Sequence, residues 1–475
     1  MIQKRILLLI IALQTAFLAI AQVTELPDKN LMYKGQQIQP DNTTSLLNAF
    51  KKGQFNIHFR YFFMSTQNEN NLTDYYADAI GAGIRFETAR FHNFQLAISG
   101  FSIANIGSSD LTKPDTLTGQ YSRYEIGHFD LNDPGKKIGL NRLEEFYLKY
   151  NFKHSYIKAG RQYINSKFIN LQDGRMSPTT VAGIWTEINE IKKFKFQLGW
   201  LWGISPRSTI SWYKPGKSIG VYPAGVNPNG TKSGYSNNLE SSGIGILQVA
   251  AEVTKQINVQ ASNMYVANIF NTSLLQMDYS LLLKNNSSAF ASLQVVKQFA
   301  VNNGGNINQS KTYFPKGSNA LTFGGRIGWK NSQWEATLNY NRITSNGRYL
   351  VPREWGIEPF FTFIPRERND GFGDLNAIMG KVNYYIPKAR LKTSVAAGYY
   401  RLPDVKNYAL NKYGMPSYTQ LYADIRYIFT NTFKGLEAEF LLVGKLNKGE
   451  TYNNNKFIFN KVNMVQYNFV LNYYF

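Results

Sequence analysis

The last twelve residues of the chain, Met464 to Phe475, read MVQYNFVLNYYF. Every second side chain, from Val465 through Tyr467 to Phe475, is apolar or aromatic, whereas most of the side chains between them are polar. A period of two is typical of a β-strand, because successive side chains of a strand point to opposite faces of its sheet. The stretch therefore predicts a strand with one face in lipid and the other mostly in water.

The same alternating unit, about ten to thirteen residues long and followed by a turn, repeats along the chain from residue 54. Its length suits a tilted membrane strand. We predict about eighteen strands, at 54–65, 76–89, 92–104, 140–152, 154–161, 179–190, 192–204, 242–254, 256–268, 272–284, 289–300, 320–330, 332–344, 375–386, 390–402, 417–430, 434–446 and 462–475.

The connections between these strands alternate in length. Short turns such as Asn331 and 387–389 follow the even strands, whereas the long segments 105–139, 205–241 and 345–374 follow odd ones. A soluble sandwich has no reason to keep this alternation, but outer-membrane barrels combine short periplasmic turns with long outer loops. The predicted fold is therefore all-β, a transmembrane antiparallel barrel whose even strand count brings both chain ends to the periplasmic side.

Composition agrees with a barrel and excludes several kinds of site. Aromatic residues make up 15% of the chain and charged residues 17%, against roughly 25% charged residues in soluble domains. The absence of cysteine excludes disulfides and thiolate sites, and the four histidines have no metal-ligand spacing. The net charge of +21 comes from scattered single residues, so we expect neither nucleic-acid binding nor a cofactor or metal.

The N-terminus has the three parts of a secretory signal peptide. Lys4 and Arg5 are followed by the apolar segment 6–18 and by a small-residue cleavage site at Ala19-Ile20-Ala21. An uncleaved anchor helix is the alternative, although the apolar stretch is short for one. We therefore divide the chain into a signal peptide at 1–21, a periplasmic N-terminal lead-in at 22–53 and the barrel at 54–475.

One segment carries a family resemblance. Gly160-Arg161-Gln162-Tyr163, followed by LQDGRMSPTTVAG at 171–183, resembles the OprD-type outer-membrane porin family, in which a strand leads into an Asp-x-Arg-x-x-Pro loop. Met176 and Ser177 stand where that family usually has two leucines. The resemblance implies that the loop at 162–178 folds inward and narrows the pore. It assigns five residues to this constriction: Arg161, Tyr163, Asp173, Arg175 and Ser177.

Strand parity nominates charged residues on the inner wall, opposite apolar residues such as Phe59 and Ile84. They are Arg60, Arg85, Lys149, Lys158, Arg326, Lys381, Arg426, Asp424, Glu437 and Glu439. Opposed charges of this kind would create a transverse field that orients a dipolar solute and passes an anion along a row of cations. Arg161 has lipid-facing parity if its strand continues regularly, which conflicts with its place in the constriction.

Together these features predict a porin in the outer membrane of a Gram-negative bacterium. We expect a diffusion channel, without catalytic residues, for small carboxylate-bearing or amino-acid-like solutes. Its expected partners are outer-membrane lipid and, through the terminal Phe475, the barrel-assembly machinery. A barrel enzyme of the lipase or protease type and a structural or adhesive barrel remain as alternatives. The sequence leaves open the solute, loop binding of calcium, and the choice between monomer and homotrimer.

Overall fold

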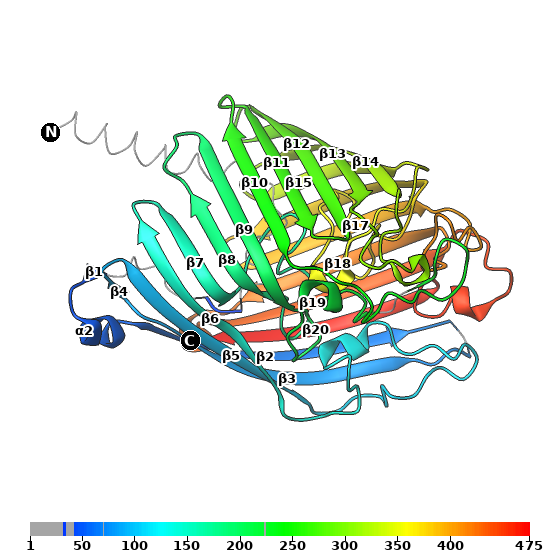
Figure 1. Ribbon diagram of the computed structural model, residues 1–475, viewed down its shortest axis with the longest axis horizontal. Coiled ribbons are helices and arrows are strands. Elements are labelled where there is room, and N and C mark those ends of the chain that lie inside the picture. Colours follow the sequence, from blue (N-terminus) through cyan, green and yellow to red (C-terminus); the bar gives the residue numbers. More distant parts are fainter. Residues whose placement is uncertain (1–31, 35–41, 70, 223–224) are drawn as a thin grey trace.

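The structure, a computed structural model, describes residues 32–34, 42–69, 71–222 and 225–475, and the predicted signal peptide lies outside them. Its single sheet has twenty strands, of which β1 (Asn42–Thr43) and β4 (Arg90–Phe91) contain two residues each and eighteen form the wall. The first and last wall strands, β2 (Gln54–Gln67) and β20 (Met464–Tyr474), pair antiparallel, so the sheet closes into a barrel (Figure 1).

The other sixteen wall strands follow one another around the barrel, each antiparallel to the next. They are β3 (Tyr75–Glu87), β5 (Phe94–Asn105), β6 (Leu140–Phe152), β7 (Ser155–Gln162), β8 (Thr180–Ile188), β9 (Phe194–Ser205), β10 (Ile244–Glu252), β11 (Ile257–Val266), β12 (Phe270–Leu282), β13 (Ser288–Ala300), β14 (Asn319–Lys330), β15 (Trp334–Ile343), β16 (Leu375–Ile386), β17 (Leu391–Arg401), β18 (Tyr418–Ile428) and β19 (Leu436–Asn447).

The predicted strands are confirmed, because each of the eighteen predicted ranges coincides with one wall strand to within a few residues. The segregation of turns also holds: the longest connections, 106–139, 206–243 and 344–374, gather at one end of the barrel (Figure 1). The connection at 267–269 is short although it lies at the long-loop end.

The side chains of the wall are distributed inside out relative to a soluble protein. Large apolar side chains such as Phe55 (57% exposed) and Leu293 (60%) cover the outer face, whereas polar ones such as Gln298 and Lys445, both 0% exposed, point inward. An outer face of this kind is stable only in a hydrocarbon medium, where backbone polar groups must also be paired. The closed barrel meets both requirements and is a transmembrane fold.

The few helices of the described residues are short and lie in the connections between wall strands, except α2, which precedes β2. They are α2 (Leu46–Lys51), α3 (Pro215–Ser218) and the 3-10 turns η2 (Glu125–His128), η3 (Gln309–Lys311), η4 (Arg353–Trp355), η5 (Asn431–Phe433) and η6 (Asn455–Phe457). In the part of the chain that the structure describes, no helix is long and apolar enough to cross a membrane.

The described residues before β2, 32–34 and 42–53, occupy two places. The strand β1 pairs in parallel with β4, and Ala89 N donates to Ala49 O in α2, so β1 and α2 lie at the short-turn rim. Residues 32–34, which belong to the predicted lead-in, instead contact the inner wall, where the Tyr33 hydroxyl donates to Gly100 O over 3.0 Å. The lead-in is therefore partly inside the barrel.

Gly160 in β7 is a position where the fold requires a glycine. Its φ angle is +126°, and an added Cβ would lie 2.2 Å from Phe146 O and 2.9 Å from Tyr147 Cα of the neighbouring strand. Both obstacles are backbone atoms, which cannot turn away as a side chain can. This glycine thus permits the close approach of β6 and β7 just before the chain leaves the wall.

We predict that Gly160→Val destabilises the barrel, since the backbone conformation alone costs a side chain about 1–3 kcal/mol and the contact with β6 adds to it. Urea unfolding of protein refolded into vesicles should show a lower midpoint. Gly380→Ala is the matched control, because Gly380 is also a strand glycine and nothing lies within 4 Å of its added Cβ. Equal midpoints for Gly160→Val and the control would contradict this role.

Candidate functional site

The segment at 163–179, which we call the inner loop, crosses the interior of the barrel. At one side Lys167 N donates to the Gln248 side chain of β10 over 2.8 Å. At the other side Arg60 of β2 donates from Nη1 to Arg175 O (2.8 Å) and to Met176 O (3.1 Å). The inner loop is thus held between opposite parts of the wall.

Ser177 anchors the end of the inner loop to the wall. Its hydroxyl is hydrogen-bonded to the buried pair Arg142 and Glu144 of β6, whose Nη2 and Oε1 atoms are 3.0 Å apart. A register shift opposite Ser99 and Gly100 turns both Glu144 and its neighbour Glu145 to the inside. The bulge at this point therefore directs two successive carboxylates into the lumen.

The centre of the interior holds one carboxylate among four arginines, a group that we call the Asp173 cluster. Asp173 forms ion pairs with Arg175 and Arg207, and its oxygens lie 2.9 Å from Arg366 Nη1 and 3.1 Å from Arg368 Nη2. All five side chains are less than a tenth exposed. The inner loop and two long loops therefore meet at a single carboxylate.

The Asp173 cluster carries an excess of positive charge. Burial alone would raise the pKa of Asp173, but Arg175, Arg207 and the other two arginines hold the pKa well below its usual range. The carboxylate therefore stays ionised and neutralises only one of four guanidinium groups. The Nε atoms of Arg175, Arg207 and Arg366 are buried without a hydrogen-bond partner. Such donors favour an anion, particularly a carboxylate, as an additional partner.

A second group of ions fixes the long loop that carries Arg366 and Arg368. Glu367 accepts from Arg123 Nη2 over 2.8 Å and from Lys445 Nζ over 3.1 Å, and it also pairs with Arg353. Arg353 in turn pairs with Asp370 at 3.1 Å. The loop is therefore tied both to β19 and to the segment between β5 and β6, which limits movement of the arginines beside it.

Seven of the predicted wall charges lie in the short-turn half of the barrel, each beside an opposite charge or an aromatic ring. Arg85 contacts Glu87 (2.7 Å) and Glu145 (2.9 Å), and Lys158 lies 4.6 Å from the ring centre of Tyr147. Lys149 lies 5.1 Å from the ring centre of Tyr156. The predicted charges Arg426, Asp424 and Glu439 form one ion-paired group, and Glu437 pairs with Lys34.

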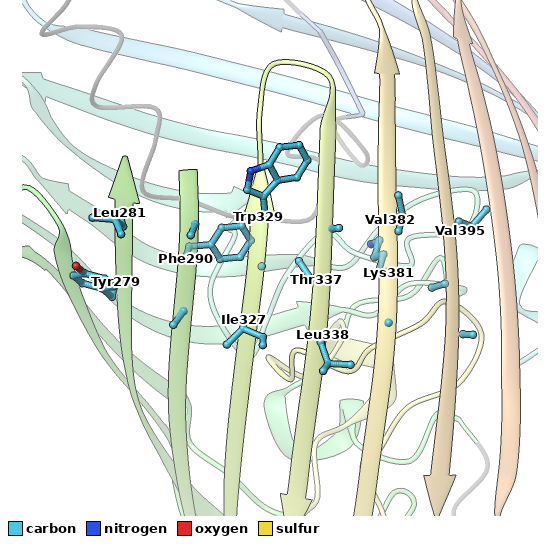
Figure 2. A pocket seen from close by; sticks show the side chains of 17 residues that line it. Tyr279, Leu281, Phe290, Ile327, Trp329, Thr337, Leu338, Lys381, Val382 and Val395 are labelled. Atoms are coloured by element: carbon cyan, nitrogen blue, oxygen red, sulfur yellow. The ribbon is translucent and has the colours of Figure 1, made fainter. Parts of the chain in front are cut away.

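The two remaining cations lie on the other side of the barrel. Arg326 of β14 stacks 4.4 Å from the ring centre of Phe361 and lies 4.0 Å from Asp278. Lys381 of β16 is half-buried. It borders a shallow hollow of about 930 Å³ over β12 to β17, lined by side chains such as Tyr279, Ile327 and Leu338 (Figure 2). Because apolar groups of the outer face line this hollow, it is separate from the Asp173 cluster.

Besides Ser177, two residues assigned to the constriction are not part of the Asp173 cluster. Arg161 pairs in register with Phe146, which is 51% exposed, and its guanidinium stacks 4.5 Å from the ring centre of Trp212. It keeps the outward parity of β7, so its assignment to the constriction is wrong. Tyr163 packs against the buried cluster that contains Met176 and Phe101, and it forms part of the support of the inner loop.

Sequence reasoning missed three of the four arginines. Arg207 lies in the connection between β9 and β10, and Arg366 and Arg368 lie in the connection between β15 and β16. These loops have no periodicity from which a facing direction could be deduced. The only available signal was the run Arg366-Glu367-Arg368 in a loop of an otherwise sparsely charged chain.

A closed membrane barrel narrowed from within by a loop is the class that this geometry defines. The sequence matches no protein-family model and no curated protein. Solved structures with the same fold include OccAB1 of Acinetobacter baumannii, with a TM-score of 0.69 and 12% identity over 93% of this chain and 99% of that chain.

Two channels of Pseudomonas aeruginosa are similar to the same degree. OccD3 has a TM-score of 0.66 and 12% identity, covering 96% of this chain and 98% of that chain. OpdK, solved with vanillate, has a TM-score of 0.66 and 11% identity, covering 90% and 99%. The structural neighbours are thus porins of the Occ and OprD type, so the resemblance of residues 160–183 is confirmed at the level of the fold.

We predict that Asp173→Asn loosens the inner loop, because it leaves four buried guanidinium groups without their counter-ion. Breaking a buried ion pair costs about 3–5 kcal/mol, so local opening should rise at least about a hundredfold. Amide hydrogen exchange over residues 171–179, followed by mass spectrometry, measures this opening. Asp110→Asn, in an exposed loop pair with Lys113, is the control. Equal exchange rates in the two variants would contradict the counter-ion role.

Proposed function

We propose that the protein is a porin of the outer membrane of a Gram-negative bacterium through which small anionic solutes diffuse. The observation that carries this proposal is the excess of cations in the Asp173 cluster, at the point where the inner loop crosses the barrel. A small carboxylate-bearing or amino-acid-like solute can replace the missing negative charge there and leave again, because it competes with Asp173 for the same donors. The vanillate bound by OpdK is a carboxylate of this size.

The paired charges on the inner wall support the same proposal. The cations Arg85, Lys149, Lys158 and Arg426 line the way from the Asp173 cluster toward the short turns, each beside a carboxylate or an aromatic ring. Weak, repeated sites of this kind pass an anion along without trapping it. A barrel enzyme or an adhesive barrel has no need of buried cations along its interior, so the arrangement favours a channel.

The remaining parts of the proposal concern export and assembly. Residues 1–21 would direct the chain out of the cytoplasm, and the short-turn end, with α2 and Phe475, would face the periplasm. Phe475 donates to Ile57 O over 3.0 Å and ends the strand that closes the barrel. We propose that the barrel-assembly machinery recognises Phe475 before that hydrogen bond forms.

We expect planar bilayers containing the pure protein to show ohmic, anion-selective channels, and Arg366→Gln to lower this selectivity. Removing one positive charge near the path should lower the anion-to-cation permeability ratio about fivefold. This factor corresponds to an electrostatic interaction of roughly 1 kcal/mol between the charge and a passing ion. The reversal potential in a salt gradient measures the ratio, and block by added vanillate should weaken in parallel.

Arg161→Gln is the matched control, because it removes the same charge from the outer face. Selectivity that falls equally in both variants would show that the Asp173 cluster does not set it. Absence of channels from pure protein, together with hydrolysis of a lipid or peptide ester, would overturn the proposal in favour of a barrel enzyme.

A further inference from the structure

Residues Met32, Tyr33 and Lys34 lie against the inner wall, far along the chain from most of their contacts. Met32 is only 2% exposed and receives a contact from Arg60 Nη1 at 3.7 Å. Lys34 Nζ lies 2.5 Å from Glu437 Oε1 and 4.8 Å from the ring centre of Tyr474. Three consecutive side chains therefore contact β2, β19 and β20 from the inside.

The wall is shaped to receive this segment. An added Cβ on Gly83 of β3 would lie 2.4 Å from the Phe101 ring and 2.5 Å from the Tyr33 hydroxyl, so the glycine leaves room for both side chains. The Tyr33 ring meets His58 edge-on, with centres 6.3 Å apart, and His58 stacks on Tyr474 at 4.6 Å. This fit indicates a built contact between the segment and the wall.

Arg60 connects the segment to the inner loop. The same Nη1 that contacts Met32 donates to the carbonyl groups of Arg175 and Met176. A solute that leaves the Asp173 cluster toward the short turns therefore passes Arg60 and then meets Tyr33 and Lys34. The segment and the inner loop are two successive obstacles along this side of the lumen.

The positive charge of Lys34 affects the charge of this end of the lumen because its neighbour Glu437 is negative. Arg426 is already paired with Asp424 and Glu439, so Glu437 depends on Lys34 for its ion pair at this end. The side chains of Lys34 and Glu437 are each 26% exposed, which leaves them accessible from the lumen. Without Lys34 the exit would present an added negative charge to an anion, which would repel it.

We propose that Met32–Lys34 form a second constriction on the short-turn side of the channel, and that Lys34 is a specificity-determining residue there because it neutralises Glu437. This inference rests on the proposed channel function. Tyr33 narrows the lumen, and Lys34 keeps the narrowed part passable to anions.

Single-channel recordings test both roles. Tyr33→Ala should raise conductance at least about twofold, and Lys34→Glu should lower the anion-to-cation permeability ratio about tenfold. The charge swap Lys34→Glu with Glu437→Lys should restore the parent's ratio, because it restores the ion pair with the same net charge. Lys51→Gln, on the exposed helix α2, is the control. Unchanged conductance and selectivity in these variants, or a swap that fails to restore selectivity, would overturn the inference.

A chemical test does not require the charge variants at residues 34 and 437 to fold. The chain contains no cysteine, so Tyr33→Cys creates a unique thiol. An anionic thiosulfonate reagent added to open channels should reduce their current, whereas an unchanged current would place residue 33 outside the conducting path. Failure of the proposed function gives a different result, since the parent itself would then lack anion-selective channels and Arg366→Gln would have no effect.

Discussion

The hydrogen bonds between β2 and β20 close the sheet, and the rest of the molecule depends on that closure. In hydrocarbon an open sheet edge would leave a row of peptide groups without partners, each at a cost of several kcal/mol. Once the edge is removed, the outer face needs only apolar side chains. The inner face is then free to carry polar and charged groups, which a soluble core of this size could not accommodate.

This freedom explains how so many ions are buried in one place. The inner loop, the connection between β9 and β10 and the connection between β15 and β16 enter a space already lined with polar side chains. There Asp173 and Glu367 each form ion pairs with several basic side chains, and these ion pairs hold the three loops against one another. These ion pairs tie the loops to the wall and to each other. The Asp173 cluster keeps a positive excess because one carboxylate faces four arginines.

The strands could be predicted from the sequence because each has one face in lipid, and that requirement marks every second residue. Parity also assigns Arg60 and Arg426 to the interior, where their contacts lie. Parity does not apply to the loops that form the constriction, and there the family motif was the only guide. A residue can belong to a family motif and still point away from the site, as Arg161 shows. The loops that carry Arg207 and Arg366 are irregular, so they have no alternation of polar and apolar residues from which a facing direction could be deduced. The inward position of Tyr33 depends on the missing side chain of Gly83, a tertiary fit without a local signal.

Two hydrogen bonds link the narrow part of the barrel to its seam. Arg60 Nε donates to the Asn472 side chain over 2.7 Å, and Arg366 Nη2 donates to the Asn468 side chain over 2.9 Å. Both asparagines belong to β20, the last wall strand in sequence order, while Arg60 belongs to β2, the first. Contacts so distant in sequence require the entropy cost of closing a long loop. Both hydrogen bonds need β20 in its place in the wall, so the constriction has all its contacts only in the closed barrel.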